Sequence, residues 1–348
     1  MKLPPIDERQ LLGFLVELLN TPSPTGFTEN AIALTERVLG SIPGVMTART
    51  RKGALLATVA GEQGDAPRAL AAHVDTLGAM VKTIKPNGRL TLSQLGGYAW
   101  NTIEGEGCTV FTRGGRRMRG SILVTTASTH VHGAKTGETK RTEETLEVRL
   151  DEKVTNESET RALGMEVGDF IAFDPRVELT NGFVRSRHLD DKAGVACVVE
   201  AARALQAAGL KPRQTTTLFI SNYEEVGHGA AGAIPADVEE LVVVDMAAVG
   251  EGQASDEFHS TLCVKDSSGP YHKGLNDRLR KLADQNEIPH KVDIYPYYGS
   301  DGSAAWRAGG NLAVALIGPG VDASHNYERT HTEALVATTN WVLAYLLS

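Results

Sequence analysis

Acidic and imidazole side chains follow one apolar segment after another in this chain, each just beyond the end of a predicted strand. RALAA is followed by His73 and Asp75, TTTLFISNY by Glu224 and Glu225, and ELVVV by Asp245. The segment LAVALIGPG leads, through a loop, to a late histidine. Because open α/β sheets bind ligands at the carboxyl ends of their strands, this repeated placement predicts that these side chains line one site.

A pair of aspartates joins this set from a helix. Asp190 and Asp191 stand where the predicted helix 192–208 begins, and the helix dipole favours negative charge there. Taken one at a time, the residues have ordinary structural explanations, such as strand-end hydrogen bonding, helix capping or solvated loop charge. Their joint appearance in one order favours a functional site, because imidazole nitrogens and carboxylate oxygens together suit two divalent metal ions.

The expected ligand roles follow from the donor atoms that each side chain offers. A neutral imidazole at His73 binds one ion, and Asp190 bridges both ions, because a carboxylate has two oxygens to share. Asp245 completes the shell of the first ion. A late histidine, His325 or His331, completes the shell of the second.

Two carboxylates are expected to serve the reaction itself. Asp75, two residues after His73, is suited to orient that imidazole ring. If Glu224 and Glu225 continue the strand before them, their side chains point in opposite directions, so they are expected to divide the roles of general base and metal ligand. We assign Glu225 to the metal and Glu224 to the base that deprotonates a water bridging the ions. Asp191 is expected to point away or to hold the start of its helix.

Composition limits the number of domains and the classes of protein to which the chain can belong. A length of 348 residues with 41% hydrophobic residues suits one large domain or two modest ones with a full core. A formal net charge of −8 argues against nucleic-acid binding, which needs a basic footprint. No apolar run approaches the ~18 residues of a membrane span. Only three cysteines are present, without a Cys-x-x-Cys pair, so we expect no disulfide framework and a cytoplasmic location.

The pattern of segments predicts two domains. Strands and helices alternate in 1–77 and 179–348, which indicates a catalytic α/β domain with a mixed, largely parallel sheet and helices on both faces. Between them, 78–178 contains short alternating segments separated by glycine, asparagine and charged clusters, which is typical of a small β-barrel-like module. The polar stretch 130–142 within this module is predicted to be a mobile loop.

Four motifs carry a resemblance to a known family: AAHVDTLGAMV, RHLDDKAGVA, YEEVGHGAAG and VVVDMA, in this order and spacing. The chain resembles, over nearly its whole length, the deblocking and glutamyl aminopeptidases, which are dinuclear metallopeptidases of the tetrahedral aminopeptidase type. The resemblance implies a zinc-peptidase-like catalytic domain, an inserted β domain that acts as a lid and in oligomerisation, and assemblies from dimers to dodecamers. It also implies two ions of zinc or cobalt and release of N-terminal residues from short peptides. Carried over, the metal ligands are His73, Asp190, Glu225, Asp245 and a late histidine, and the catalytic residues are Asp75 and Glu224.

The chain departs from the family's pattern at two positions. Thr76 follows the His-x-Asp motif where the family usually has an acidic residue, and the late histidine lies in DASHNYERTH rather than in a His-Ser-Pro context. Spacing from the predicted strand 312–317 favours His325 as the last ligand, with His331 as the alternative. Together with RHLDDKAG and YYGSDGSAA, this segment resembles a bacterial subfamily associated with synthesis of the osmolyte N-acetylglutaminylglutamine amide, which implies a small capped dipeptide as substrate.

The favoured function is therefore a dinuclear metal-dependent aminopeptidase or amidohydrolase. One alternative is an endoglucanase-like glycoside hydrolase, which places two carboxylates across a sugar ring, but aromatic residues make up only 5% of the chain and supply a sugar cleft poorly. A non-catalytic metal-bound binding protein is the other alternative, and the presence of both Glu224 and Asp75 argues against it. The expected partners are a short peptide or capped dipeptide and further copies of the chain, with no nucleic acid and no membrane.

Overall fold

The chain divides into two compact units in the computed structural model, which describes residues 2–348. Among the described residues, one unit comprises 2–75 and 176–348, and the other comprises Thr76–Pro175. Within residues 2–348, every helix is too short or too polar to cross a membrane. Cys108, Cys197 and Cys263 are all buried and free.

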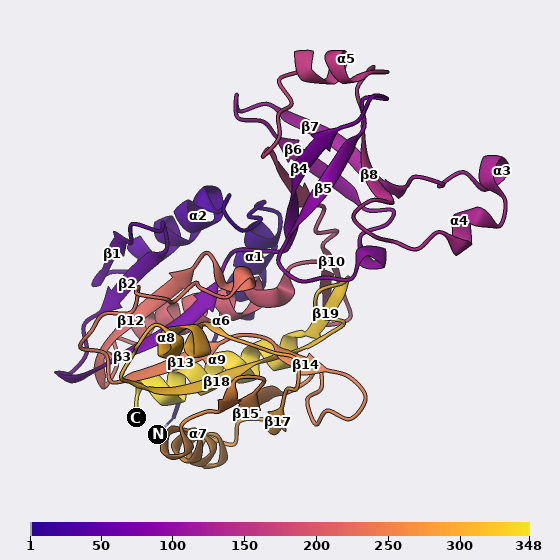
Figure 1. Ribbon diagram of the computed structural model, residues 1–348. Helices are drawn as coiled ribbons and strands as arrows, with labels where there is room; N and C mark the ends of the chain where they lie inside the picture. Colours follow the sequence, from indigo (N-terminus) through magenta and orange to yellow (C-terminus); the bar gives the residue numbers. More distant parts are fainter. Residues whose placement is uncertain (1) are drawn as a thin grey trace. The chain divides into compact units, whose positions relative to one another are not determined.

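The larger unit is built on one extended mixed sheet. The strands along its main path are β1 (Val45–Arg49), β2 (Leu55–Val59), β12 (Gln214–Ser221), β3 (Gln63–His73), β13 (Glu240–Val244), β18 (Ala313–Asp322), β19 (Glu328–His331), β11 (Phe183–Ser186) and β10 (Glu178–Thr180), in that spatial order (Figure 1). The central strands β12, β3, β13 and β18 run parallel to one another. The outer strands pair antiparallel. The predicted fold class, a mixed α/β sheet interrupted by a β module, is confirmed.

Shorter strands extend this sheet beside β18. They are β14 (Ala247–Val249), β15 (Ser260–Asp266), β16 (Gly269–Pro270) and β17 (His290–Ile294). β14 pairs parallel with the end of β18, and β15 pairs antiparallel with its middle.

Alternation along the central strands gives each face of the sheet its own core. On β3, Leu70 and Ala72 belong to one hydrophobic cluster, whereas Ala69 and Ala71 belong to another, because successive side chains point to opposite faces. The first cluster takes buried side chains from α1 (Glu8–Leu19), α2 (Glu29–Gly40), α6 (Leu189–Ala207), α7 (Lys273–Gln285) and α9 (Thr332–Leu346). The second takes Ala305 from α8 (Asp301–Arg307), so helices cover both faces.

The smaller unit is a closed barrel with the strand order β4-β5-β8-β7-β6-β9. Its strands are β4 (Gly78–Ile84), β5 (Leu90–Leu95), β6 (Gly107–Phe111), β7 (Arg117–Val124), β8 (Leu146–Leu150) and β9 (Phe170–Phe173). Val81, Leu92 and Ile122 belong to a separate core inside this unit. A 3-10 turn, η1 (Trp100–Thr102), and a short helix, α5 (Glu157–Ala162), lie in its connections.

One prediction about the barrel unit was wrong in part. The stretch 130–142, predicted as a mobile loop, contains two short helices, α3 (Thr129–His132) and α4 (Lys135–Glu138). Neither helix buries a side chain. A helix without an apolar face leaves no hydrophobic period in the sequence, which is why the pattern gave no sign of them.

Candidate metal centre

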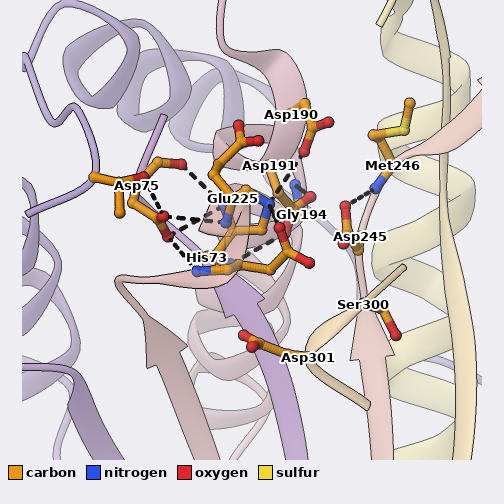
Figure 2. A network of polar contacts seen from close by, with 12 residues as sticks. His73, Asp75, Asp190, Asp191, Gly194, Glu225, Asp245, Met246, Ser300 and Asp301 are labelled. Atoms are coloured by element: carbon orange, nitrogen blue, oxygen red, sulfur yellow. Dashed lines mark hydrogen bonds and ion pairs between the residues drawn. The ribbon is translucent and has the colours of Figure 1, made fainter. Parts of the chain in front are cut away.

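The carboxyl ends of the parallel strands bring the first predicted site residues together. His73 is the last residue of β3 and is paired in register with Ser221, the last residue of β12. Asp245 directly follows Val244, the last residue of β13. Both site residues are buried, His73 at 2% exposure and Asp245 at 3%. Neighbouring parallel strands thus end at one edge and present an imidazole and a carboxylate to the same space (Figure 2).

His73, Asp190 and Asp245 form what we call the first donor group. One potential ligand atom from each lies within 4.8 Å of the others. Nε2 of His73 lies 3.1 Å from Oδ1 of Asp190. The N–H of Met246 donates to Oδ1 of Asp245 at 2.7 Å, which holds that carboxylate at the end of β13 (Figure 2).

Asp190, Glu225 and His325 form what we call the second donor group, because one potential ligand atom from each likewise lies within 4.8 Å of the others. Nε2 of His325 lies 3.4 Å from Oδ2 of Asp190 and 3.5 Å from Oε2 of Glu225. Asp190 belongs to both groups and turns one carboxylate oxygen toward each histidine. A single carboxylate in this position has the geometry to be shared between two cations.

The structure brings His325, and not His331, to these carboxylates. His331 is the residue before α9, and its Nδ1 accepts a hydrogen bond from the N–H of Glu333 at 3.2 Å. Its ring packs edge-on against Phe183, with 4.8 Å between the ring centroids. His331 therefore caps a helix and packs against an aromatic side chain.

Glu224 and Glu225 do not continue the strand, so the condition on which strand alternation would separate them is not met. They belong to a short 3-10 helix, η2 (Glu224–Val226), after β12. Their side chains nevertheless face different groups: Oε2 of Glu224 lies 3.7 Å from Nε2 of His73, whereas Glu225 faces His325. The two glutamates can therefore divide the roles of base and ligand, because the turn directs Glu224 toward His73 and Glu225 toward His325.

Asp75 is the centre of a buried hydrogen-bond network (Figure 2). Its Oδ1 accepts from the N–H of Glu224 at 3.1 Å, and its Oδ2 accepts from the N–H of Glu225 at 3.2 Å and from the hydroxyl of Thr25 at 2.7 Å. The nearest oxygen to Nδ1 of His73 is the main-chain carbonyl of Asp75 at 2.9 Å, while Oδ1 lies at 3.5 Å. Donation from Nδ1 to this carbonyl leaves Nε2 as the ligand atom, an arrangement common to metal-binding histidines.

Asp191 holds the beginning of α6. Its Oδ2 accepts from the N–H of His73 and its Oδ1 from the N–H of Gly194, both at 3.2 Å. Asp190 and Asp191 themselves have non-helical backbone angles, and the peptide bond between them is cis. Gly194 has no room for a side chain, because an added Cβ would lie 2.3 Å from the carbonyl oxygen of Val244.

Two further buried carboxylates were not among the predicted ligands or catalytic residues. Glu328, 2% exposed, accepts the N–H of Asp190 at 3.1 Å and that of His325 at 3.0 Å. Asp301, 1% exposed, accepts the N–H of Ala230 at 2.7 Å and so supports the loop that follows η2. Glu328 lies inside the motif DASHNYERTH, but nothing local in the sequence reveals a partner 138 positions away.

Burial and mutual repulsion govern the protonation of the carboxylates. Burial, together with the charge of Asp190, raises the pKa of Asp245 to about 7 and that of Glu225 to about 8. Burial and the neighbouring charge of Asp245 also raise the pKa of Glu224 well above its ordinary value. The protein fold thus concentrates more negative charge than the site's own histidines neutralise.

The histidines respond in the complementary direction. Burial alone would lower the pKa of His73, but the carboxylates of Asp190 and Asp75 raise it well above the ordinary value. Burial also acts to raise the pKa of Asp190, but hydrogen bonds with His325 and His73 lower it overall. Imidazole and carboxylate donors with this excess of negative charge fit two divalent cations of the zinc type.

Comparisons with known proteins agree with this chemistry. The chain matches the family of M42 glutamyl aminopeptidases over residues 53–340. It is 46% identical over 341 residues to YhfE of Bacillus subtilis, a candidate aminopeptidase, with 98% of each chain covered. It is 28% identical over 282 residues to the glutamyl aminopeptidase of Lactococcus lactis, with 76% of each chain covered.

Solved structures share the fold. A TET aminopeptidase from a marine-sediment archaeon of the Thaumarchaeota superposes with a TM-score of 0.86 at 19% identity, covering 97% of this chain and 96% of the other. The TET1 peptidase of Pyrococcus horikoshii, described as assembling into a tetrahedron or a large octahedral shell, superposes with a TM-score of 0.85 at 20% identity, covering 97% and 99%.

Proposed function

The chain belongs to the M42 glutamyl aminopeptidase family and is a metallo-aminopeptidase of that family. On this premise we propose that, at the two donor groups described above, it releases N-terminal residues from short peptides or hydrolyses a small capped dipeptide. The observation that carries the proposal is the position of Asp190, which presents one oxygen to His73 and the other to His325. The family assignment also favours peptide hydrolysis over the glycoside-hydrolase alternative.

We propose that the first donor group (His73, Asp190, Asp245) holds one ion and the second (Asp190, Glu225, His325) holds the other. The donor set suits zinc or cobalt, since it combines imidazole nitrogen with carboxylate oxygen. When bound, two such ions polarise a scissile carbonyl and lower the pKa of water. Asp190, which turns one oxygen toward His73 and the other toward His325, would be the ligand common to both ions.

Glu224 is proposed as the general base. Its carboxylate faces the first donor group without belonging to either group, so it is available to accept a proton from the attacking water and to pass it to the leaving amine. Asp75 is proposed to fix this base in place, because its carboxylate accepts the N–H groups of Glu224 and Glu225, and its main-chain carbonyl lies 2.9 Å from Nδ1 of His73. A shift of Asp75 would displace the base and a ligand together.

The natural substrate is proposed from the subfamily resemblance. RHLDDKAG, YYGSDGSAA and DASHNYERTH together favour a small capped dipeptide of the N-acetylglutaminylglutamine amide type.

We also propose that further copies of the chain are its protein partners. The segment 78–178 is proposed to act as a lid and in oligomerisation, and 1–77 with 179–348 to form the catalytic domain. The assemblies described for the Pyrococcus horikoshii peptidase support this second proposal.

The test is a measurement of metal per chain together with hydrolysis of a panel: glutamyl, leucyl and lysyl anilides, an N-acetylated glutamine dipeptide amide, and a β-glucan. Two ions per chain with hydrolysis of free-amino anilides, lost on chelation and restored by zinc or cobalt, would support the aminopeptidase proposal. Two ions with hydrolysis of the capped dipeptide alone would select the osmolyte-linked substrate. Full activity in metal-free protein, or activity on β-glucan that survives chelation, would overturn the proposal.

A further inference from the structure

One buried carboxylate joins the two backbone segments that carry Asp190 and His325. Glu328 is the first residue of β19 and is 2% exposed. Its Oε2 accepts from the N–H of Asp190 and its Oε1 from the N–H of His325. Each oxygen is therefore committed to a different segment, and the side chain spans the gap between them.

The topology explains why residue 328 occupies this position. Glu328 is paired with Ser186 across the antiparallel β11–β19 ladder, and Asp190 follows four residues after the end of β11. His325 lies in the turn between β18 and β19, three residues before Glu328. The start of β19 is thus the point of the sheet that lies next to both segments.

Both segments need such support more than the other ligand positions do. His73 and Asp245 stand at the ends of central strands, where the parallel ladder fixes the backbone. Asp190 has non-helical backbone angles at the beginning of α6, and His325 has φ +63°. The latter is a left-handed conformation that residues other than glycine rarely adopt, so an added hydrogen bond at its N–H helps to hold it.

We propose that Glu328 is a positioning residue that sets the separation of Asp190 and His325 and thereby the affinity of the second donor group for its metal ion. Glu328 is not itself in either donor group, and both its oxygens accept backbone N–H groups, so a ligand role is not needed to explain its burial. The inference rests on the proposed two-metal function. It adds that the second ion, for which Glu328 holds the segments of both Asp190 and His325, depends on this carboxylate more than the first ion, for which it holds Asp190 alone.

The test variant is Glu328→Gln, which keeps the shape of the side chain but has one acceptor oxygen and turns an NH2 group toward the other backbone N–H. The probe is Co²⁺, titrated into metal-free protein in competition with a chromophoric chelator, with visible absorption recorded at each addition. We expect the affinity for the second ion to fall about 10- to 100-fold, the usual effect of removing an outer-shell partner, and that for the first ion to fall less, because Glu328 supports only one of its ligands, Asp190.

The matched control is Glu257→Gln. Glu257 is also buried against β19, but its carboxylate pairs with Arg329, the residue beside Glu328, at 2.6 and 2.8 Å. The control removes a charge next to the same strand without touching either ligand segment, so both ions are expected to bind as in the wild type. His325→Ala serves as the reference for loss of the second donor group.

The outcomes separate this inference from the function on which it rests. Normal binding of both ions by Glu328→Gln, with one ion lost in His325→Ala, would overturn the positioning role and leave the two-metal site intact. Two tight ions in His325→Ala would overturn the metal assignment and the inference with it. If the glutamine variant does not fold, hydrogen–deuterium exchange of the wild type decides: rapid exchange at the amides of both Asp190 and His325 would overturn the proposal, and protection at both would support it.

Discussion

The hydroxyl of Thr25 donates a 2.7 Å hydrogen bond to Oδ2 of Asp75, fifty residues later in the chain. Both residues are buried, Asp75 completely. The same carboxylate accepts the N–H groups of Glu224 and Glu225. Thr25 therefore helps to fix the side chain of Asp75, which in turn holds the backbone of the proposed base, Glu224. The segment between α1 and α2 thus contributes to the site although it carries none of the predicted ligands.

Replacing Thr25 with valine removes this donor and keeps the shape of the side chain. We expect Thr25→Val to lower the free energy of unfolding by about 1–3 kcal/mol, the usual cost of leaving a buried acceptor short of a partner. Urea denaturation measures the change. Thr25→Ser retains the hydroxyl and is the control; equal stability of the two variants would show that the hydrogen bond contributes nothing.

Glu224→Gln tests the base directly. The amide cannot accept the proton, so we expect kcat to fall by about 10²–10⁴-fold, the range attributed to general acid–base catalysis. Metal content should stay at the wild-type value, since Glu224 is in neither donor group. Glu152→Gln, an exposed position in the barrel unit, is the control and should leave both quantities unchanged. Turnover near the wild-type rate in metal-loaded Glu224→Gln would contradict the assignment.

Removing the metal should make stability depend on pH in a defined direction. Burial raises the pKa of Asp245 to about 7 and that of Glu225 to about 8, so between about pH 4.5 and 7 the folded metal-free protein binds protons that the unfolded chain releases. The free energy of unfolding should therefore fall as pH rises through this window, by about 1.4 kcal/mol per pH unit for each such group. Lys192, whose pKa burial lowers to about 7, opposes the trend only above that value.

Urea denaturation in chelator, at pH values across this window, measures the effect. Zinc-loaded protein is the matched sample, and its slope should be much smaller, because bound cations keep the carboxylates ionised. Metal-free stability that rises with pH would show that the buried carboxylates do not keep their protons.

Two glycines should respond to alanine in opposite ways. Gly13 lies within α1, and an added Cβ would meet no atom within 4 Å, so Gly13→Ala should stabilise the protein by about 0.5–1 kcal/mol through helix propensity. Gly194→Ala would place its Cβ 2.3 Å from the carbonyl oxygen of Val244 and 2.4 Å from Oδ1 of Asp191, and should destabilise it by about 1–3 kcal/mol or more. Thermal unfolding compares the two variants. An unfolding temperature of Gly194→Ala equal to that of the wild type would show that α6 can shift away from β13 without loss of stability.

His331→Ala distinguishes the two late histidines. Because His331 caps α9 and packs on Phe183, its loss should reduce stability by about 0.5–2 kcal/mol, the usual cost of losing a helix cap. Metal content should not change, and elemental analysis after dialysis checks this. Loss of an ion in this variant would reverse the assignment of the last ligand to His325.

Much of the site could be predicted from the chain's local patterns. An apolar run such as ELVVV predicts a buried strand from its own residues, and a polar residue directly after it is expected at the carboxyl edge of a parallel sheet. His73 and Asp245 were predicted in this way, and the structure places them in one donor group. Asp190 was recognised from its place before a helix, although its backbone is not helical.

The amino-acid sequence alone thus determined the order of strands and helices and the chemical types of the donors, because hydrophobic period and strand ends are properties of neighbouring residues. The tertiary structure alone decided that His325 and not His331 meets Asp190, and that Thr25 and Glu328 support the site. These outcomes depend on strand register, on a left-handed turn and on hydrogen bonds between residues 50 and 138 positions apart. No local pattern encodes such contacts, since they exist only after distant strands have paired.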